Sequence, residues 1–85
     1  MKQVCFDANA WEDYLYWQSN NKAMLKRINS LIKEISRTPF SGVGKPESLK
    51  GNLSGFWSRR ITDEHRLIYT IYDDRIIIIQ CRLHY

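Results

Sequence analysis

The clearest pattern in the chain is a helical repeat of apolar positions between residues 22 and 37. Apolar side chains recur at intervals of one and three residues, at Met24, Leu25, Ile28, Leu31, Ile32 and Ile35. This spacing is typical of one face of an amphipathic helix. Thr38-Pro39 ends the pattern, because proline restricts the residue before it and has no amide proton to donate. A preceding helix is predicted from Asp7, a suitable N-cap, to about Asn20.

The other segments favour strands and loops. Val4-Cys5-Phe6 is a short apolar run that suits a first strand, and residues 41–47 are predicted to form a loop by their glycine and proline content. Three further strands are predicted, at residues 56–61, 66–72 and 75–83, with Asp73-Asp74 as the turn between the last two. The predicted fold is α+β: a short N-terminal strand, two helices, then an antiparallel meander of three strands, with the helices packed on one face. Residues 1–85 are expected to form a single domain.

The alternation of side chains along the last strands predicts which residues share a face. Leu67, Tyr69 and Ile71 are expected to face the helices. A strict two-residue turn at positions 73–74 pairs Arg66 with Cys81 and places Arg66 on the face opposite His84. We therefore expect a three-residue turn or a β-bulge, either of which brings Arg66 and His84 to one face.

By the same parity, Ile76 and Ile78 are expected to lie on the face away from the helices, together with Arg82 and His84. Apolar side chains exposed on so small a domain usually mark an interaction surface.

Composition narrows the class of protein only modestly. Hydrophobic residues make up 44% of the chain, which argues against disorder, and a net charge of +4 gives a mild preference for polyanions. Cys5 and Cys81 are predicted to be buried, reduced thiols rather than a disulfide. The chain shows no secretory signal and no apolar stretch that spans a membrane, so a cytoplasmic protein is expected.

Several chemically capable side chains lie in the second half of the chain. They comprise one carboxylate, several cations, an imidazole and a phenol, at Glu47, Lys50, Arg59, Arg60, Arg66, His84 and Tyr85. These are the groups that a metal-free ribonuclease needs, since RNA carries its own 2′-hydroxyl nucleophile. No cysteine or histidine spacing indicates zinc, and no acidic cluster indicates magnesium. A solvated loop glutamate, arginines that protect a strand edge and a frayed terminal histidine explain the same residues without catalysis.

Three stretches carry a resemblance to a known family: WEDYLYWQ, RTPFSGVGKPESLKGNLSGFWSRRITDEHRLIY and the terminal CRLHY. They closely resemble the YoeB (Txe) family of RelE-type toxins, and the resemblance extends over essentially the whole chain. That family belongs to bacterial toxin–antitoxin modules. Its members are known as ribosome-dependent mRNA interferases of RelE/ParE-like fold, which cut the message in the ribosomal A site.

The resemblance assigns roles to matching positions. It implies Glu47 of GKPE as general base, Arg66 of EHRL as stabiliser of the phosphorane and His84 of the terminal HY as general acid. Tyr85 is implied to help place the substrate, and Lys50 and Arg60 to bind phosphate. Arg59 is a weaker RNA-binding candidate, because alternation directs it to the other side of the strand. No metal or cofactor is implied.

The resemblance also implies partners. They are the ribosome, mRNA and a cognate, YefM-like antitoxin that is partly disordered until bound, with operator DNA contacted through the antitoxin and a homodimer left open. The alternative is a ParE-like toxin that binds a DNA topoisomerase without cutting RNA, and a plain RNA-binding module is a third reading. The presence of a loop glutamate and a terminal histidine favours the nuclease.

Overall fold

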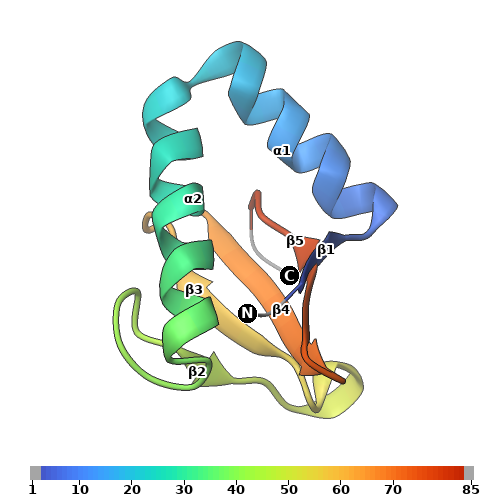
Figure 1. Ribbon diagram of the computed structural model, residues 1–85. Helices are drawn as coiled ribbons and strands as arrows, with labels where there is room; N and C mark the ends of the chain where they lie inside the picture. Colours follow the sequence, from blue (N-terminus) through green and yellow to red (C-terminus); the bar gives the residue numbers. More distant parts are fainter. Residues whose placement is uncertain (1–2, 84–85) are drawn as a thin grey trace.

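The computed structural model describes residues 3–83, so His84 and Tyr85 lie outside the described residues. Figure 1 shows a strand, two helices and a sheet, in the order that the sequence predicts. The elements are β1 (Gln3–Phe6), α1 (Ala8–Asn20), α2 (Lys22–Arg37), β2 (Glu47–Ser48), the 3-10 helix η1 (Gly51–Leu53), β3 (Trp57–Arg60), β4 (Arg66–Tyr72) and β5 (Arg75–Gln80).

Both helices begin at side chains that cap their first turns. The Asp7 carboxylate accepts a hydrogen bond from the amide of Ala10 at 2.8 Å, as predicted. The Asn21 side chain accepts from the amides of Ala23 and Met24, so a single asparagine breaks the first helix and starts the second. The apolar repeat of α2 is buried at Ile28, Leu31 and Ile35.

The sheet has the strand order β1-β5-β4-β3-β2. The predicted meander of β3, β4 and β5 is antiparallel, as expected. β1 pairs in parallel with β5 at one edge, and the short β2, which the sequence left inside a loop, pairs with β3 at the other edge. The core joins one face of this sheet to both helices, through Ala10, Trp17, Ile28, Leu31, Ile35, Ile61, Leu67, Tyr69, Ile76, Ile78 and Cys81.

The register of β4 and β5 contains the expected β-bulge. Tyr72 pairs with Arg75, so the turn between them has two residues. Tyr69 pairs with Ile78, whereas Ile68 pairs with Gln80, so β5 carries one extra residue at position 79. Beyond the bulge, Gln80, the last residue of β5, shares the face of Ile68.

The prediction that Ile76 and Ile78 face away from the helices is wrong. Both side chains are fully buried in the core beneath the helices. The bulge lies on the C-terminal side of Ile78, so the change of face applies only to the residues that follow it. These two isoleucines therefore offer no surface to a partner.

The last strand is also shorter than predicted, since β5 ends at Gln80 rather than at Leu83. Both cysteines are free thiols, with Cys81 buried and Cys5 half-buried. Among residues 3–83, no helix is long and apolar enough to cross a membrane.

Candidate functional site

The strand register gathers four polar residues on the face of the sheet opposite the helices. Glu47 lies across from Ser58, and Arg60 lies across from Arg66. Ser58 and Arg60 are two residues apart on β3, so their side chains point to the same side. Together with Lys45, these residues line a hollow of about 160 Å³.

Two glycines shape the loop that brings Lys45 and Glu47 to this hollow, at positions 42 and 44. The carbonyl of Gly44 accepts a hydrogen bond from the amide of Arg60 at 2.7 Å, which fastens the loop to β3. A Cβ atom at Gly44 would lie 2.9 Å from a methyl carbon of Leu31, and Gly44 has a φ of +89°. Both the close approach to α2 and the left-handed backbone therefore favour glycine here.

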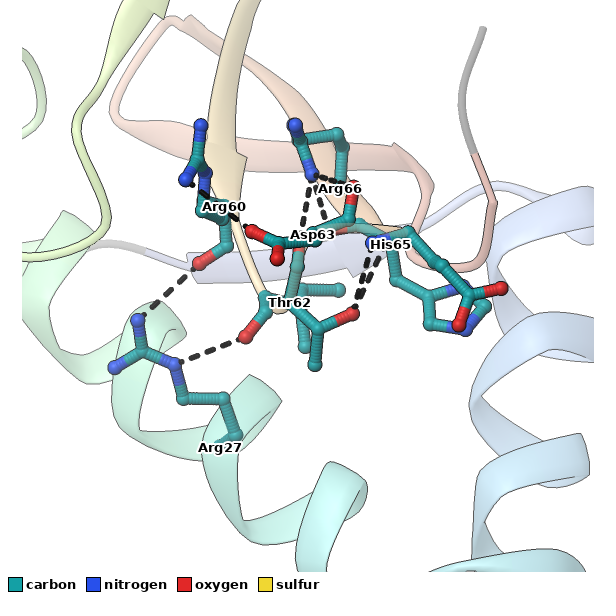
Figure 2. A network of polar contacts seen from close by, with 8 residues as sticks. Arg27, Arg60, Thr62, Asp63, His65 and Arg66 are labelled. Carbon is teal, nitrogen blue, oxygen red and sulfur yellow. Dashed lines mark hydrogen bonds and ion pairs between the residues drawn. The ribbon is translucent and has the colours of Figure 1, made fainter.

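The turn between β3 and β4 orients Arg66. Figure 2 shows the Arg60 and Arg66 side chains extending to the same side of the two strands. The Arg66 Nη1 atom donates to the carbonyls of Thr62, Asp63 and His65, at 2.5, 3.0 and 3.2 Å. The turn thus holds one nitrogen of the guanidinium while the side chain lines the hollow.

Arg60 is held less tightly than Arg66. Its Nη1 atom forms an ion pair with Asp63 at 3.4 Å, and the Arg60 side chain remains 43% exposed. Arg27 reaches from α2 to donate to the carbonyls of Arg60 and Ile61, at 3.2 and 3.4 Å, which fixes the main chain at the start of the turn (Figure 2). The backbone of Arg60 is therefore fixed, and its guanidinium can adjust to a ligand.

The chain also returns to this site near its C-terminal end. The amide of Arg66 donates to the carbonyl of Leu83 at 3.1 Å. Leu83 precedes His84 in the sequence, so the last described residue lies against the main chain of a candidate catalytic residue. The predicted roles of His84 and Tyr85 concern positions outside the described residues.

Arg59 is not brought to the hollow. Its side chain is fully buried on the helix side of the sheet. The guanidinium donates to the Tyr69 hydroxyl at 3.0 Å and to three loop carbonyls, those of Thr38, Ser41 and Val43. Burial raises the pKa of Tyr69, and the Arg59 hydrogen bond opposes that effect. Arg59 therefore fastens the loop to the sheet, and its buried guanidinium has no surface on which to meet RNA.

Lys50 lies on the other side of Glu47. Glu47, Ser48, Leu49 and Lys50 line a second, more open hollow of about 570 Å³. Glu47 borders both hollows, so one carboxylate lies between Lys50 and the cations of the first hollow.

Sequence reasoning missed two residues of the site, Lys45 and Ser58. The signal for Ser58 was its alternation with Arg60 along the strand. No local pattern distinguishes Lys45 from other loop lysines. Two tertiary contacts bring it to the hollow: the pairing of β2 with β3 and the hydrogen bond of the neighbouring Gly44 carbonyl to the Arg60 amide.

The first hollow combines three cationic side chains with one carboxylate. Guanidinium groups bind phosphate oxygens in a bidentate manner, and a carboxylate beside them can accept a proton. Within residues 3–83, no three His, Cys, Asp or Glu side chains gather as a metal-binding group. Fold and site thus define a small, basic α+β protein with a polar pocket that suits a phosphodiester.

Comparison with known proteins gives the family. Residues 6–85 match the family model of the YoeB-like toxin of the bacterial type II toxin–antitoxin system. Toxin YoeB of a Synechocystis species is 60% identical over 83 residues, which cover 98% of this chain and 96% of that protein. The chain therefore belongs to the YoeB-like toxins of bacterial type II toxin–antitoxin systems.

Solved structures agree in fold. A YoeB–YefM complex from Staphylococcus aureus superposes with a TM-score of 0.92 at 51% identity, covering 100% of this chain and 99% of that chain. A YoeB dimer from the same organism also gives 0.92, at 50% identity, with coverage of 99% and 98%.

Proposed function

We propose that this toxin is a ribosome-dependent endoribonuclease that cuts mRNA in the ribosomal A site and so halts translation. The observation that carries the proposal is the hollow in which the Glu47 carboxylate lies among the cations of Lys45, Arg60 and Arg66. RNA supplies its own nucleophile, so a base, an acid and positive charge at the phosphate are sufficient for cleavage.

The proposed reaction assigns one step to each group. Glu47 removes the proton of the 2′-hydroxyl, and the 2′-oxygen forms a bond to the adjacent phosphorus. The bond from phosphorus to the 5′-oxygen breaks, and that oxygen takes a proton from His84. The products are a 2′,3′-cyclic phosphate and a 5′-hydroxyl.

The cations stabilise the charge that develops on the phosphoryl oxygens. Arg66 is the principal group, because its guanidinium is anchored at Nη1 and so needs little reorganisation during the reaction. Arg60 and Lys50, with Lys45, bind neighbouring phosphates, and Tyr85 helps to place the nucleotide. The hydrogen bond from Arg66 to Leu83 supports a role for the chain's C-terminal end beside this arginine.

The partners follow from the same assignment. The cognate partner is a YefM-like antitoxin, since the Staphylococcus aureus relative forms a complex with YefM. Antitoxin segments of this kind fold upon binding, and any contact with operator DNA is made through the antitoxin. The free toxin forms a homodimer, by analogy with the YoeB dimer of Staphylococcus aureus. Action on translating ribosomes places the toxin in the cytoplasm.

The test compares cleavage of a translated message by wild type, Glu47→Gln, Arg66→Ala and His84→Ala in a translation extract. Glu12→Gln is the matched control, because it removes an exposed carboxylate of α1. We expect each site variant to cut about a hundredfold more slowly or worse, and the control to cut normally. The new 5′ ends should carry hydroxyl groups and follow the reading frame. Undiminished cutting by His84→Ala contradicts the mechanism.

The same experiment separates the alternatives. A ParE-like topoisomerase poison causes DNA damage signalling on induction without frame-dependent mRNA ends. A plain RNA-binding module cuts nothing as wild type, and Glu47→Gln then binds RNA at least as well, because the change removes a negative charge. Cleavage that survives EDTA at concentrations that leave ribosomes intact is expected for the proposed chemistry.

A further inference from the structure

The last described residue of the chain is docked on a pair of neighbouring residues, His65 and Arg66. The amide of Leu83 donates to the Nδ1 atom of His65 at 2.8 Å. The carbonyl of Leu83 accepts from the amide of Arg66 at 3.1 Å. Leu83 has a φ of 65°, in the left-handed region that leucine rarely adopts. These two hydrogen bonds hold the chain in this turned conformation, together with those that the Gln80 side chain donates to the carbonyls of Arg82 and Leu83, at 3.1 and 3.3 Å.

The regular pairing of β5 does not extend to this segment. β5 ends at Gln80, so residues 81–83 depend on contacts made outside the strand ladder. Helix α1 contributes two of them: Asp13 accepts from the amide of Cys81 at 3.0 Å, and the Trp17 indole donates to the carbonyl of Cys81 at 2.9 Å. These contacts fix Cys81, two residues before Leu83. At Leu83 the donor is the main-chain amide, and the acceptor is a histidine.

The imidazole of His65 is itself held in place. Its ring meets the ring of Trp17 edge to face, with the ring centres 4.8 Å apart. The amide of His65 donates to the Thr62 hydroxyl at 3.2 Å, and its carbonyl accepts from the Arg66 guanidinium at 3.2 Å. The contact with the Leu83 amide uses Nδ1 as the acceptor, which leaves Nε2 to carry the ring proton. One residue thus contacts both Arg66 and the segment that leads to His84.

We propose that His65 is a positioning residue, whose Nδ1 atom holds Leu83, and with it the segment that leads to His84, beside Arg66. This role rests on the proposed nuclease function, in which His84 protonates the leaving oxygen. A general acid must lie within hydrogen-bond reach of that oxygen, and a misplacement of about 1 Å can lower the rate about a hundredfold. His65 does not touch the substrate in this proposal and acts only through Leu83.

Three substitutions separate the acceptor from the ring. In His65→Asn, the amide oxygen lies where Nδ1 lies relative to the backbone, so the acceptor is kept and the ring is lost. In His65→Phe, the ring that packs against Trp17 is kept and the acceptor is lost. His65→Leu provides a second side chain without an acceptor, in case phenylalanine prevents folding.

The first measurement is the hydrogen exchange of the Leu83 amide, followed by NMR in the isolated toxin. We expect exchange about tenfold faster in His65→Phe and His65→Leu, and close to the wild-type rate in His65→Asn. Unchanged exchange in the variants that lack the acceptor overturns the contact itself. This measurement does not depend on RNA cleavage, so it reports on the contact between His65 and Leu83 even where the proposed function fails.

The second measurement is single-turnover cleavage on programmed ribosomes. We expect the rate at saturating toxin to fall about a hundredfold in His65→Phe and His65→Leu, with the half-saturating toxin concentration unchanged. His65→Asn, which keeps the acceptor, should retain most of the wild-type cleavage rate. Faster Leu83 exchange with an unchanged cleavage rate overturns the positioning role, as does an equal loss in all three variants. Absence of cleavage by wild type instead contradicts the nuclease function.

Discussion

Arg60 and Arg66 lie directly opposite one another across β3 and β4, with their side chains on the same face of the sheet. Two like charges in such a cross-strand pair destabilise the folded protein. The ion pair of Arg60 with Asp63 offsets little of this cost, because both side chains are well exposed to solvent. A phosphate between the two guanidinium groups removes the repulsion, so the pair favours an anionic ligand over an empty site.

The first prediction concerns the salt dependence of RNA binding by Arg60→Gln. The ligand is a short single-stranded RNA with a 2′-deoxy group at the nucleotide to be cut, which removes the nucleophile. We expect weaker binding and a slope of log K against log salt that is smaller by about 0.7, the contribution of one phosphate contact. Arg75→Gln is the matched control, since Arg75 is an exposed arginine at the start of β5. Equal effects of the two substitutions would show that only net charge matters.

The second prediction concerns Arg59, which is buried and holds three loop carbonyls and the Tyr69 hydroxyl. Arg59→Met leaves these buried acceptors without their donor, so we expect the free energy of unfolding to fall by about 3 kcal/mol. Arg60→Met, one position along the same strand, should change it by less than about 1 kcal/mol. Urea denaturation with a common m-value measures both. Similar values for the two variants would contradict the structural role of Arg59.

The contrast between Arg59 and Arg60 shows how much of the side-chain arrangement can be predicted from the sequence. Alternation along a strand separates the two arginines by face, and the structure bears that out. With strict alternation and a two-residue turn, Arg66 and His84 would lie on opposite faces, so the sequence predicted a longer turn or a β-bulge. The structure has the two-residue turn and contains the bulge in β5. Its position was not predictable, because the four consecutive isoleucines of β5 give the same apolar pattern on either face. The error over Ile76 and Ile78 follows directly from that ambiguity.

The candidate site was predictable in part. Glu47, Arg60 and Arg66 were assigned by family resemblance, and the structure brings these three residues to one hollow. Lys45 was not predicted to belong to the site, because loop lysines are common and its position depends on a two-residue strand pairing. His65 escaped notice because its acceptor atom meets a backbone amide 18 residues away, a contact that leaves no periodic trace in the sequence.

The third prediction concerns the two thiols. Burial, with a smaller contribution from the Asp13 carboxylate, raises the pKa of Cys81 to about 12. At pH 8 its thiolate fraction is therefore about a thousandfold lower than that of an ordinary cysteine with a pKa of about 8.5. We expect iodoacetamide to label Cys5 in the folded protein and Cys81 only after unfolding. Mass spectrometry of quenched samples measures both sites.

The pKa of Cys81 also predicts the direction of a pH effect on stability. A thiol whose pKa is higher in the folded state stabilises the fold fully below its unfolded pKa, and that contribution is lost as pH rises toward 12. Wild type should therefore lose stability between about pH 9 and pH 12 more steeply than Cys81→Ala. Cys5→Ser is the control for the other thiol and should follow wild type. Rapid labelling of Cys81 by iodoacetamide at pH 8 in the folded protein would contradict the raised pKa of this thiol.

The fourth prediction concerns the turn between β4 and β5. Asp73 and Asp74 have φ values of 49° and 62°, so both central residues of this two-residue turn are left-handed. This conformation is strained for residues other than glycine, although aspartate and asparagine tolerate it better than most. Replacing the pair by Asn-Gly keeps the turn type, relieves the strain at position 74 and removes two adjacent negative charges. We expect the free energy of unfolding to rise by about 1 kcal/mol.

The double alanine variant tests the cause of that gain. It also removes both charges but offers no relief of the left-handed backbone, so we expect its stability to fall relative to wild type by about 1 kcal/mol. Urea denaturation of both variants separates the two terms. Equal stabilisation by Ala-Ala and Asn-Gly would assign the gain to charge removal alone. A loss with Asn-Gly would instead show that the aspartate side chains make stabilising contacts. The Asn-Gly variant keeps the turn type and hence the register of β4 and β5, so under the proposed nuclease function it should cut RNA at the wild-type rate. Slower cutting would show that the turn influences the site through β5.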